Sequence, residues 1–282
     1  MSTPPRAFVI GWPIGHSRSP LIHRYWLKAY GIAGSYDAVA VRPEELAGFL
    51  AEVRAGAFVG GNVTVPHKES IFRLLAGRTD ERAAAAEAVN TLYQAADGAL
   101  SATNTDIAGF LANLDAETPG WDRARGRAVL LGGGGAARGI AFALASRGIA
   151  VTLVNRTRAR TEDIARRIGG AVTAQDWAAL PAHLAEADLL VNATSLGMTG
   201  NPPLAIDLDP LPRDAVVADI VYAPLETPLL AAARRRGNAV VDGLGMLLHQ
   251  AVPGFERWFG VRPEVTTALR DLVVADLEGH RP

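Results

Sequence analysis

Short apolar runs alternate with helix-forming segments along the second half of the chain. The apolar runs are rich in β-branched residues, which favour strands. Strands that alternate regularly with helices predict a parallel sheet with right-handed crossovers. The expected strands are 128–131, 150–154, 171–173, 187–191, 215–221 and 239–241.

The first half of the chain follows a similar pattern, with an added hairpin about the turn Ala96-Asp97-Gly98. Its expected strands are 7–10, 36–41, 58–66, 89–93 and 100–102. The pair Ser19-Pro20 predicts a helix with Ser19 as its N-cap and Pro20 at its first position, and Gly31 ends that helix. The whole pattern therefore indicates an α/β protein.

Polar side chains gather at the ends of the expected strands in the first half. Ser17 lies in the loop after the first strand, where ligand-facing hydroxyl groups are common. In the third strand, alternation places Asn62 and Thr64 on one face and directs Val63 and Val65 toward the core. An amide and a hydroxyl group are therefore expected side by side at the end of a strand.

Two charged residues begin helices after these strands. A lysine in the first turn of a helix, as at Lys68, opposes the helix dipole, although an ordinary surface lysine is the simple alternative. Asp106 follows the polar run 103–105 and precedes a helix. It is therefore either an N-cap or a functional carboxylate.

Length and composition restrict the class of protein. The 282 residues suffice for two domains or one large domain, and a formal net charge of −1 shows no basic footprint for nucleic acid. Without cysteine there is no disulfide framework or thiolate metal site, and the six histidines lack metal-ligand spacing, so no metal is expected. No apolar run reaches the roughly 18 residues of a membrane span, and residues 1–6 lack a signal-peptide pattern. We therefore expect a cytoplasmic protein without a membrane partner.

A glycine-rich turn joins the expected strand 128–131 to a helix and has the form G-x-G-x-x-A between Gly132 and Ala137. Such a turn lets the backbone approach a pyrophosphate, and the helix behind it directs unpaired N–H groups at the anion. Four adjacent glycines also suit any tight loop, so this alternative stays open. The turn and the residue after it are Gly132, Gly133, Gly134, Gly135 and Ala136.

The end of the next strand bears on the choice of nucleotide. An NAD site usually has Asp or Glu about 20 residues past the glycines, where it holds the ribose 2′-hydroxyl group. This chain has Asn155 there, followed by Arg156, Thr157 and Arg160. Two guanidinium groups can bind a 2′-phosphate, so NADP is favoured over NAD. The alternative is that both arginines belong to a solvated helix start.

Eight short motifs follow one another along the chain. They are Ser17-Arg18-Ser19-Pro20, Asn62 to Lys68, Ala88 to Thr91, Asn104 to Asp106, the glycine turn, Asn155 to Thr157, Asn192 to Ser195, and Asp242 to Leu247. In this order they resemble the shikimate dehydrogenase family, including its quinate-using relatives, over nearly the whole chain.

The resemblance implies a two-domain α/β enzyme. Residues 1–106, completed by 245–282, would form an α/β substrate-binding and catalytic domain with a mostly parallel sheet. Residues 107–244 would form a Rossmann-type, doubly wound domain that binds NADP. The substrate would be a cyclohexene carboxylic acid, and the protein would be a monomer or a homodimer.

The resemblance also implies roles for individual residues. Lys68 and Asp106 resemble the catalytic pair. Ser17 and Ser19 would bind the substrate carboxylate, and the remaining substrate positions would be Asn62, Thr64, Asn90, Tyr222 and Gln250. The pyrophosphate would lie on Gly132 to Ala136. The remaining cofactor positions would be Asn155, Arg156, Thr157 and Arg160 at the 2′-phosphate, with Met198 and Gly243 near the nicotinamide.

The implied reaction is the reversible, NADP-dependent reduction of 3-dehydroshikimate to shikimate. Lys68 would exchange a proton with the substrate oxygen or stabilise a developing alkoxide, while Asp106 orients it. The alternatives are a quinate or aminoshikimate-type dehydrogenase, a non-catalytic ligand-sensing relative and a folate-type methylene dehydrogenase. Quinate-preferring relatives often have Thr at one carboxylate position, so two serines favour shikimate. A sensing relative would be expected to lose Lys68 or Asp106.

Overall fold

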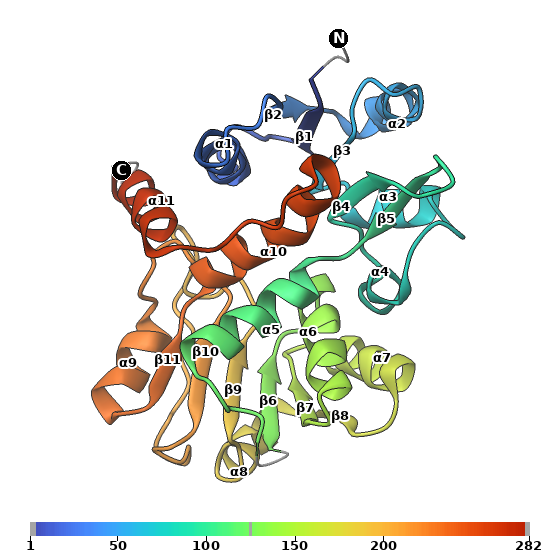
Figure 1. The fold of residues 1–282 in the computed structure, drawn as a ribbon. Helices are drawn as coiled ribbons and strands as arrows, with labels where there is room; N and C mark the ends of the chain where they lie inside the picture. Colours follow the sequence, from blue (N-terminus) through green and yellow to red (C-terminus); the bar gives the residue numbers. More distant parts are fainter. Residues whose placement is uncertain (1–3, 124–125, 280–282) are drawn as a thin grey trace. The chain divides into compact units, whose positions relative to one another are not determined.

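The computed structural model describes residues 4–123 and 126–279, which form two compact α/β units (Figure 1). The first unit comprises Met1–Thr105 and Gln250–Pro282, and the second comprises Asp106–His249. The chain therefore passes twice from one unit to the other, after Thr105 and again within helix α10, Gly243–Phe259.

The first unit is built on a five-stranded sheet with the order β2-β1-β3-β4-β5. Strands β2, β1 and β3 are parallel, whereas β4 is antiparallel to both of its neighbours, so only β4 runs against the others. The hairpin expected around residues 96–98 is the pair β4 and β5. The strands are β1 Arg6–Gly11, β2 Ser35–Ala40, β3 Gly60–Val63, β4 Thr91–Gln94 and β5 Leu100–Thr103.

Helices cover both faces of this sheet. Phe8 of β1 packs on one face with Leu50 and Ile71, which belong to α2 and α3. On the other face, Tyr36 of β2 stacks on His23 of α1 and lies near Trp258 of α10. The helices of this unit are α1 Ser19–Ala29, α2 Leu46–Arg54, α3 Lys68–Leu74, α4 Glu81–Ala86, the end of α10, and α11 Thr267–Gly279.

Two local predictions for this unit are wrong. Helix α1 begins at Ser19 itself, and the hydroxyl group of Ser17 accepts a hydrogen bond from the Ser19 N–H at 3.4 Å, so Ser19 is not the N-cap. Strand β3 ends at the buried Val63, and Val65 is 69% exposed instead of facing the core. The cause is that the chain turns after Thr64, where the His67 N–H donates a hydrogen bond to the Thr64 carbonyl oxygen at 3.0 Å.

The second unit is built on six parallel strands with the order β11-β10-β9-β6-β7-β8. The chain runs outward from β6 in one direction and from β9 in the other, which is the doubly wound arrangement that the family resemblance implied. The point where the direction changes, between β6 and β9, is where such sheets bind their ligands. The strands are β6 Arg127–Leu131, β7 Ala150–Val154, β8 Val172–Gln175, β9 Leu189–Asn192, β10 Val216–Asp219 and β11 Ala239–Val241.

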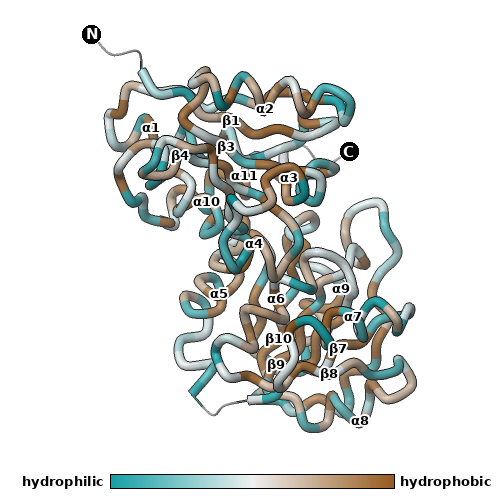
Figure 2. Tube along the Cα trace, turned by 90° about the vertical axis from the view of Figure 1, so that its right-hand side faces the viewer, coloured by the Kyte–Doolittle hydropathy of each residue, from teal (hydrophilic) through white to brown (hydrophobic). Residues whose placement is uncertain are grey.

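Alternate residues of β6 face the two helical layers of this unit. Leu130 packs with α5, α6 and α7, and Leu131 packs on the other face with α8 and α9. Figure 2 shows the corresponding hydrophobic stretches along the strands labelled β9 and β10. None of the helices in residues 4–123 and 126–279 is both long and apolar enough to span a membrane. The helices are α5 Asp106–Glu117, α6 Gly135–Ser146, α7 Arg158–Ile168, α8 Leu180–Leu184 and α9 Pro228–Arg236.

Candidate active site

Polar residues at the ends of β3, β4 and β5 form one buried hydrogen-bond network. Asn62 donates from Nδ2 to the backbone oxygen of Asn90 at 3.1 Å and to Oγ1 of Thr91 at 3.2 Å. The Oδ1 atom of Asn90 accepts from the N–H of Thr105 at 2.7 Å and from its hydroxyl group at 3.1 Å. The structure thus brings together residues from three of the sequence motifs.

Gln250 joins this network from helix α10. Asn90 donates from Nδ2 to Oε1 of Gln250 at 3.3 Å, across 160 residues of sequence. The hydroxyl group of Thr105 lies 3.5 Å from the same oxygen. Helix α10 therefore completes a cluster whose residues are far apart in the sequence.

The backbones of Lys68 and Asp106 are held close to Asn90. Lys68 is the first residue of α3, and its carbonyl oxygen accepts a hydrogen bond from the Val89 N–H at 2.9 Å. Asp106 is the first residue of α5 and directly follows Thr105, whose N–H is bonded to Asn90. Both side chains are half-buried. The two charged candidates therefore begin helices that are attached to the same polar network.

Three hydroxyl side chains lie where neighbouring strands end. Ser17 and Ser19 follow β1, and Thr64 follows β3, which is the parallel neighbour of β1. The Thr64 N–H donates to the backbone oxygen of Ile10 at 2.9 Å, which fixes Thr64 beside the end of β1. Ser17 and Thr64 are half-buried and Ser19 is buried. These hydroxyl groups belong to the loops after β1 and β3 and to the first residue of α1, at the carboxyl edge of the sheet, where α/β proteins bind ligands.

Sequence analysis did not single out Tyr36, Thr91 or Thr105, which the structure places in or beside the network. Tyr36 donates from its hydroxyl group to Oδ1 of Asn62 at 2.5 Å, and it is fully buried. Thr91 belongs to the motif Ala88 to Thr91, and Thr105 belongs to the motif Asn104 to Asp106. The sequence therefore held evidence that could have identified both as candidate site residues. No sequence feature identified Tyr36, because an aromatic residue in a strand is typical of any hydrophobic core.

The glycine turn joins β6 to α6 at the middle of the second sheet. Gly132 has a φ of +133°, and a Cβ on it would lie 2.8 Å from the backbone oxygen of Ala193, which follows β9. Gly134 occupies the N-cap of α6 in an extended conformation, and a Cβ on it would meet no described atom within 4 Å. The space in front of this helix start suits a pyrophosphate.

Arg160 and Asn155 adjoin this turn. A Cβ on Gly133 would lie 3.0 Å from both the Arg160 Cβ and the Asn155 Nδ2 atom. Asn155 donates from Nδ2 to the backbone oxygen of Thr157 at 3.1 Å and so shapes the loop after β7. Four of the predicted cofactor positions, Gly133, Asn155, Thr157 and Arg160, therefore gather at the ends of β6 and β7.

Arg156 and Arg160 differ from the other arginines around α7. Arg158 pairs with Glu162 at 2.8 Å, and the two arginines near the end of the helix pair with Asp163. Over the described part of the chain, Arg156 and Arg160 are exposed and have no acidic partner. Two guanidinium groups without an acidic partner in the described chain, one on the loop after β7 and one in the first turn of α7, fit a ribose 2′-phosphate.

The ends of β9 and β10 carry a second polar network, centred on Asp219. Its carboxylate accepts hydrogen bonds from Asn192 Nδ2 at 3.0 Å, from the Val221 N–H at 3.0 Å and from the Thr227 hydroxyl group at 2.8 Å. Burial raises the pKa of Asp219, and these three donors oppose that shift. Asn192 also donates into the loop after β9, which carries Met198, 41% exposed. Sequence analysis missed Asp219, although an acid at the end of an apolar strand was a usable signal.

Gly243 lies where the backbone after β10 passes the start of α10. A Cβ on Gly243 would collide with the backbone oxygens of Ile220 and Val221. Packing therefore requires glycine at position 243. The half-buried Tyr222 directly follows Val221 in the chain.

Within residues 4–123 and 126–279, no three His, Asp or Glu side chains gather as a metal site would require.

Three family models match the chain. They are described as the shikimate dehydrogenase substrate binding domain, over residues 9–92; shikimate / quinate 5-dehydrogenase, over residues 116–198; and the shikimate 5′-dehydrogenase C-terminal domain, over residues 243–270. The chain is also 59% identical over 274 residues to the shikimate dehydrogenase (NADP(+)) of Methylocella silvestris, with 97% of each chain covered.

Solved structures agree with these matches. The shikimate 5-dehydrogenase of Thermus thermophilus in complex with NADP(H) and shikimate is 36% identical, with a TM-score of 0.84 and coverage of 97% of this chain and 99% of that one. Quinate dehydrogenase from Corynebacterium glutamicum in complex with NAD is 31% identical, with a TM-score of 0.87 and coverage of 96% and 99%. The chain therefore belongs to the shikimate dehydrogenase family.

Proposed function

We propose that the protein is an NADP-dependent oxidoreductase that interconverts 3-dehydroshikimate and shikimate. The relative from Methylocella silvestris, which is named shikimate dehydrogenase (NADP(+)), supports this activity at 59% identity over nearly the full chain. The structural observation that carries the proposal is the buried network in which Asn62, Asn90 and Gln250 meet. This network brings together amide side chains from distant motifs. It lies beside helix α3, whose first residue is Lys68.

The first unit would bind an acid that bears several hydroxyl groups. The hydroxyl groups of Ser17 and Ser19 would donate hydrogen bonds to the carboxylate. Amide side chains both donate and accept, so they suit the hydroxyl groups of a cyclohexene acid. The residues proposed for those hydroxyl groups are Asn62, Thr64, Asn90 and Gln250, with Tyr222 near the substrate.

Lys68 would exchange a proton with the reacting oxygen of the substrate, and Asp106 would orient the Lys68 ammonium group. An ammonium group beside this oxygen stabilises the negative charge that develops on it, and it can also transfer the proton. Bound NADP supplies the hydride chemistry, and the protein supplies orientation and charge. The attachment of both helix starts to the Asn90 network supports these roles.

The second unit would select NADP through Arg156 and Arg160. Their guanidinium groups have no acidic partner in the described chain, so they can bind a 2′-phosphate without breaking an ion pair. The backbone from Gly132 to Ala136 would bind the pyrophosphate at the start of α6. Met198 and Gly243 would lie near the nicotinamide.

Quinate dehydrogenation with NAD is the alternative, because the solved relative from Corynebacterium glutamicum is a quinate dehydrogenase in complex with NAD. The serine pair at 17 and 19 favours shikimate over quinate, and the two arginines favour NADP over NAD. A ligand-sensing role is less well supported, because both Lys68 and Asp106 are present.

A spectrophotometric assay of cofactor reduction tests the proposal. Purified protein would be offered shikimate and quinate, each with NADP and with NAD. We expect turnover mainly with shikimate and NADP. Turnover of quinate with NAD would overturn both specificity arguments, and folded protein that is inactive with all four pairs would overturn the proposed activity.

The assembly and location of the protein also remain predictions. We expect a monomer or a homodimer, which sedimentation of the purified protein would test, and no nucleic-acid or membrane partner. A cytoplasmic location would be tested by cell fractionation with an antibody against the protein.

A further inference from the structure

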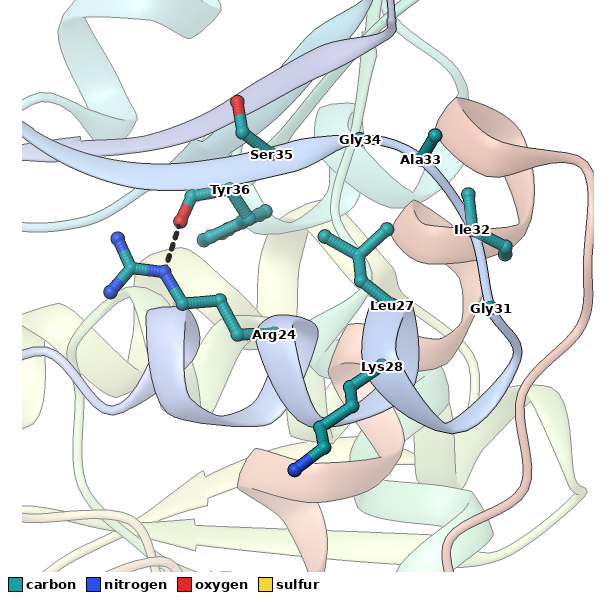
Figure 3. Close-up of a pocket in the computed structure, with 9 residues that line it drawn as sticks. All are labelled: Arg24, Leu27, Lys28, Gly31, Ile32, Ala33, Gly34, Ser35 and Tyr36. Atoms are coloured by element: carbon teal, nitrogen blue, oxygen red, sulfur yellow. Dashed lines mark hydrogen bonds between the residues drawn. The ribbon is translucent and has the colours of Figure 1, made fainter.

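Tyr36 connects a core strand to Asn62, one of the proposed substrate-binding residues. Its hydroxyl group lies 2.5 Å from Oδ1 of Asn62, and the two residues are 0% and 5% exposed. Because β1 lies between β2 and β3, the Tyr36 side chain spans the width of one strand to reach Asn62. Figure 3 shows Tyr36 near the start of β2, where Arg24 of α1 donates to its backbone oxygen at 2.9 Å.

The chemistry of the neighbouring atoms fixes the orientation of the Asn62 amide. One end of the amide lies 3.1 Å from the backbone oxygen of Asn90, and a carbonyl oxygen can only accept. That end must therefore be the nitrogen. The oxygen then faces Tyr36, whose hydroxyl group must be the donor. The reverse orientation would place two carbonyl oxygens against each other inside the protein.

Among the described residues, this orientation leaves the Asn62 side chain with one position that makes no hydrogen bond, although the nearby His23 ring also interacts with this side chain. Both hydrogens of Nδ2 are occupied, by the Asn90 backbone oxygen and by Oγ1 of Thr91. An amide oxygen has two lone pairs, and the Tyr36 hydroxyl group occupies one of them. The remaining lone pair can only accept a hydrogen bond.

Aromatic neighbours hold the Tyr36 ring in place. The His23 ring stacks on it with a centroid distance of 4.0 Å and an interplanar angle of 14°. Burial lowers the pKa of His23 to about 3, so this ring is neutral near neutral pH. Burial likewise raises the pKa of Tyr36 well above its usual value, so its hydroxyl group keeps the proton that it donates.

We propose that Tyr36 is a positioning residue that fixes Asn62 as a hydrogen-bond acceptor, so that this position selects a substrate hydroxyl group able to donate. A carbonyl, ether or fluorine at the same place on the ligand would meet the Asn62 oxygen without a hydrogen bond. The inference rests on the proposed function, because it takes Asn62 as a residue that contacts the substrate.

Steady-state kinetics of four proteins test this inference: wild type, Tyr36→Phe, Asn62→Ala and the double variant. Tyr36→Phe keeps the ring and removes only the hydroxyl group, which can both donate and accept. We expect it to raise the KM for shikimate about 10-fold, because the Asn62 amide is released. The KM for NADP and kcat should change less than about twofold. In the Asn62→Ala background, Tyr36→Phe should change the KM for shikimate less than about twofold, since it acts through Asn62.

Tyr30→Phe is the matched control. It also removes a tyrosine hydroxyl group that takes part in a hydrogen bond, with the Glu264 N–H at 3.1 Å, but Tyr30 is 41% exposed and outside the network. Its KM for shikimate should equal that of the wild type. An unchanged KM in Tyr36→Phe, or an equal increase in both backgrounds, would overturn the inference while the proposed function stands. A wild type that does not turn over shikimate would overturn both.

Substrate analogues test the same inference should Tyr36→Phe fail to fold. Each non-reacting hydroxyl group of shikimate would be replaced in turn by fluorine, which cannot donate, and by an amino group, which can. With wild-type protein, one fluoro analogue should have a KM about 10-fold above its amino counterpart. This difference should disappear in Asn62→Ala. Equal KM values for every fluoro and amino pair would overturn the inference.

Discussion

The side-chain oxygen of Asn113 fills the space that a Cβ on Gly245 would need. Asn113 lies on α5 and also donates from Nδ2 to the backbone oxygen of Asp242 at 2.7 Å. Asp242 and Gly245 belong to the motif at the start of α10, so one buried amide fastens α5 to α10. These are the two helices at which the chain passes from one unit to the other.

Gly245→Ala should therefore destabilise the protein. A methyl group at this position displaces Asn113 and breaks its bond to Asp242, although alanine favours helices more than glycine does. Overpacking and a lost buried hydrogen bond together should lower the free energy of unfolding by about 2–4 kcal/mol. Urea unfolding followed by circular dichroism measures this change.

Gly48→Ala is the matched control, because Gly48 lies within helix α2 and a Cβ on it would meet no described atom within 4 Å. This substitution should stabilise the protein by about 0.5–1 kcal/mol. Equal effects of the two substitutions would contradict the role of Asn113.

His23→Phe should make the protein more resistant to acid. Burial lowers the pKa of His23 from 6.5 to about 3, so between these pH values the unfolded chain binds a proton that the folded chain excludes. The stability that neutral His23 provides is complete above pH 6.5 and is lost as the pH falls toward 3, by about 1.4 kcal/mol per pH unit. Phenylalanine keeps an aromatic ring against Tyr36 and does not titrate.

The measurement compares the free energies of unfolding of wild type and His23→Phe across this pH range. The difference should move in favour of the variant by about 3 kcal/mol between pH 6.5 and roughly pH 4. Among the described residues neither ring nitrogen of His23 has a hydrogen-bond partner, and the nearby Asn62 side chain opposes the pKa shift without reaching hydrogen-bond geometry. Parallel stability curves would show that His23 does not titrate in this way.

Arg156→Ala and Arg160→Ala should each weaken binding of NADP and leave NAD unaffected. Loss of a charge-assisted hydrogen bond to the 2′-phosphate should raise the KM for NADP roughly 10- to 100-fold. Arg166→Ala is the control, because Arg166 pairs with Asp163 at the far end of α7 and is 73% exposed. Equal losses with NADP and NAD would place the arginines away from the 2′-phosphate.

Lys68→Ala should abolish turnover with little effect on folding. Removal of a general acid–base group typically costs about 10²- to 10⁴-fold in kcat. The Lys68 side chain is half-buried and its backbone bond to Val89 does not depend on the side chain, so the thermal midpoint should change little. Single-turnover and steady-state rates, with circular dichroism as the folding control, measure both effects. An active Lys68→Ala variant would contradict the role assigned to Lys68.

Much of the fold follows from local patterns. The six strands expected in the second half correspond to β6 through β11, because a short apolar, β-branched run followed by a helix is visible within about ten residues. The sequence pattern did not reveal the short helix α8, and it placed the start of α1 one residue too late. Val65 is a further example. The alternation of polar and apolar residues continues through Val65 in the sequence, whereas strand β3 ends at Val63 and Val65 is exposed.

The amino-acid sequence by itself determined where most strands and helices lie, which polar residues stand at strand ends, and the glycine turn with its neighbouring arginines. These features depend on residues that are close together in the chain. Only the tertiary structure decided that Gln250 bonds to Asn90, that Tyr36 orients Asn62, and that Asn113 occupies the space beside Gly245. Such contacts depend on strand order and helix packing, which bring distant residues within hydrogen-bond distance and which no short stretch of sequence specifies.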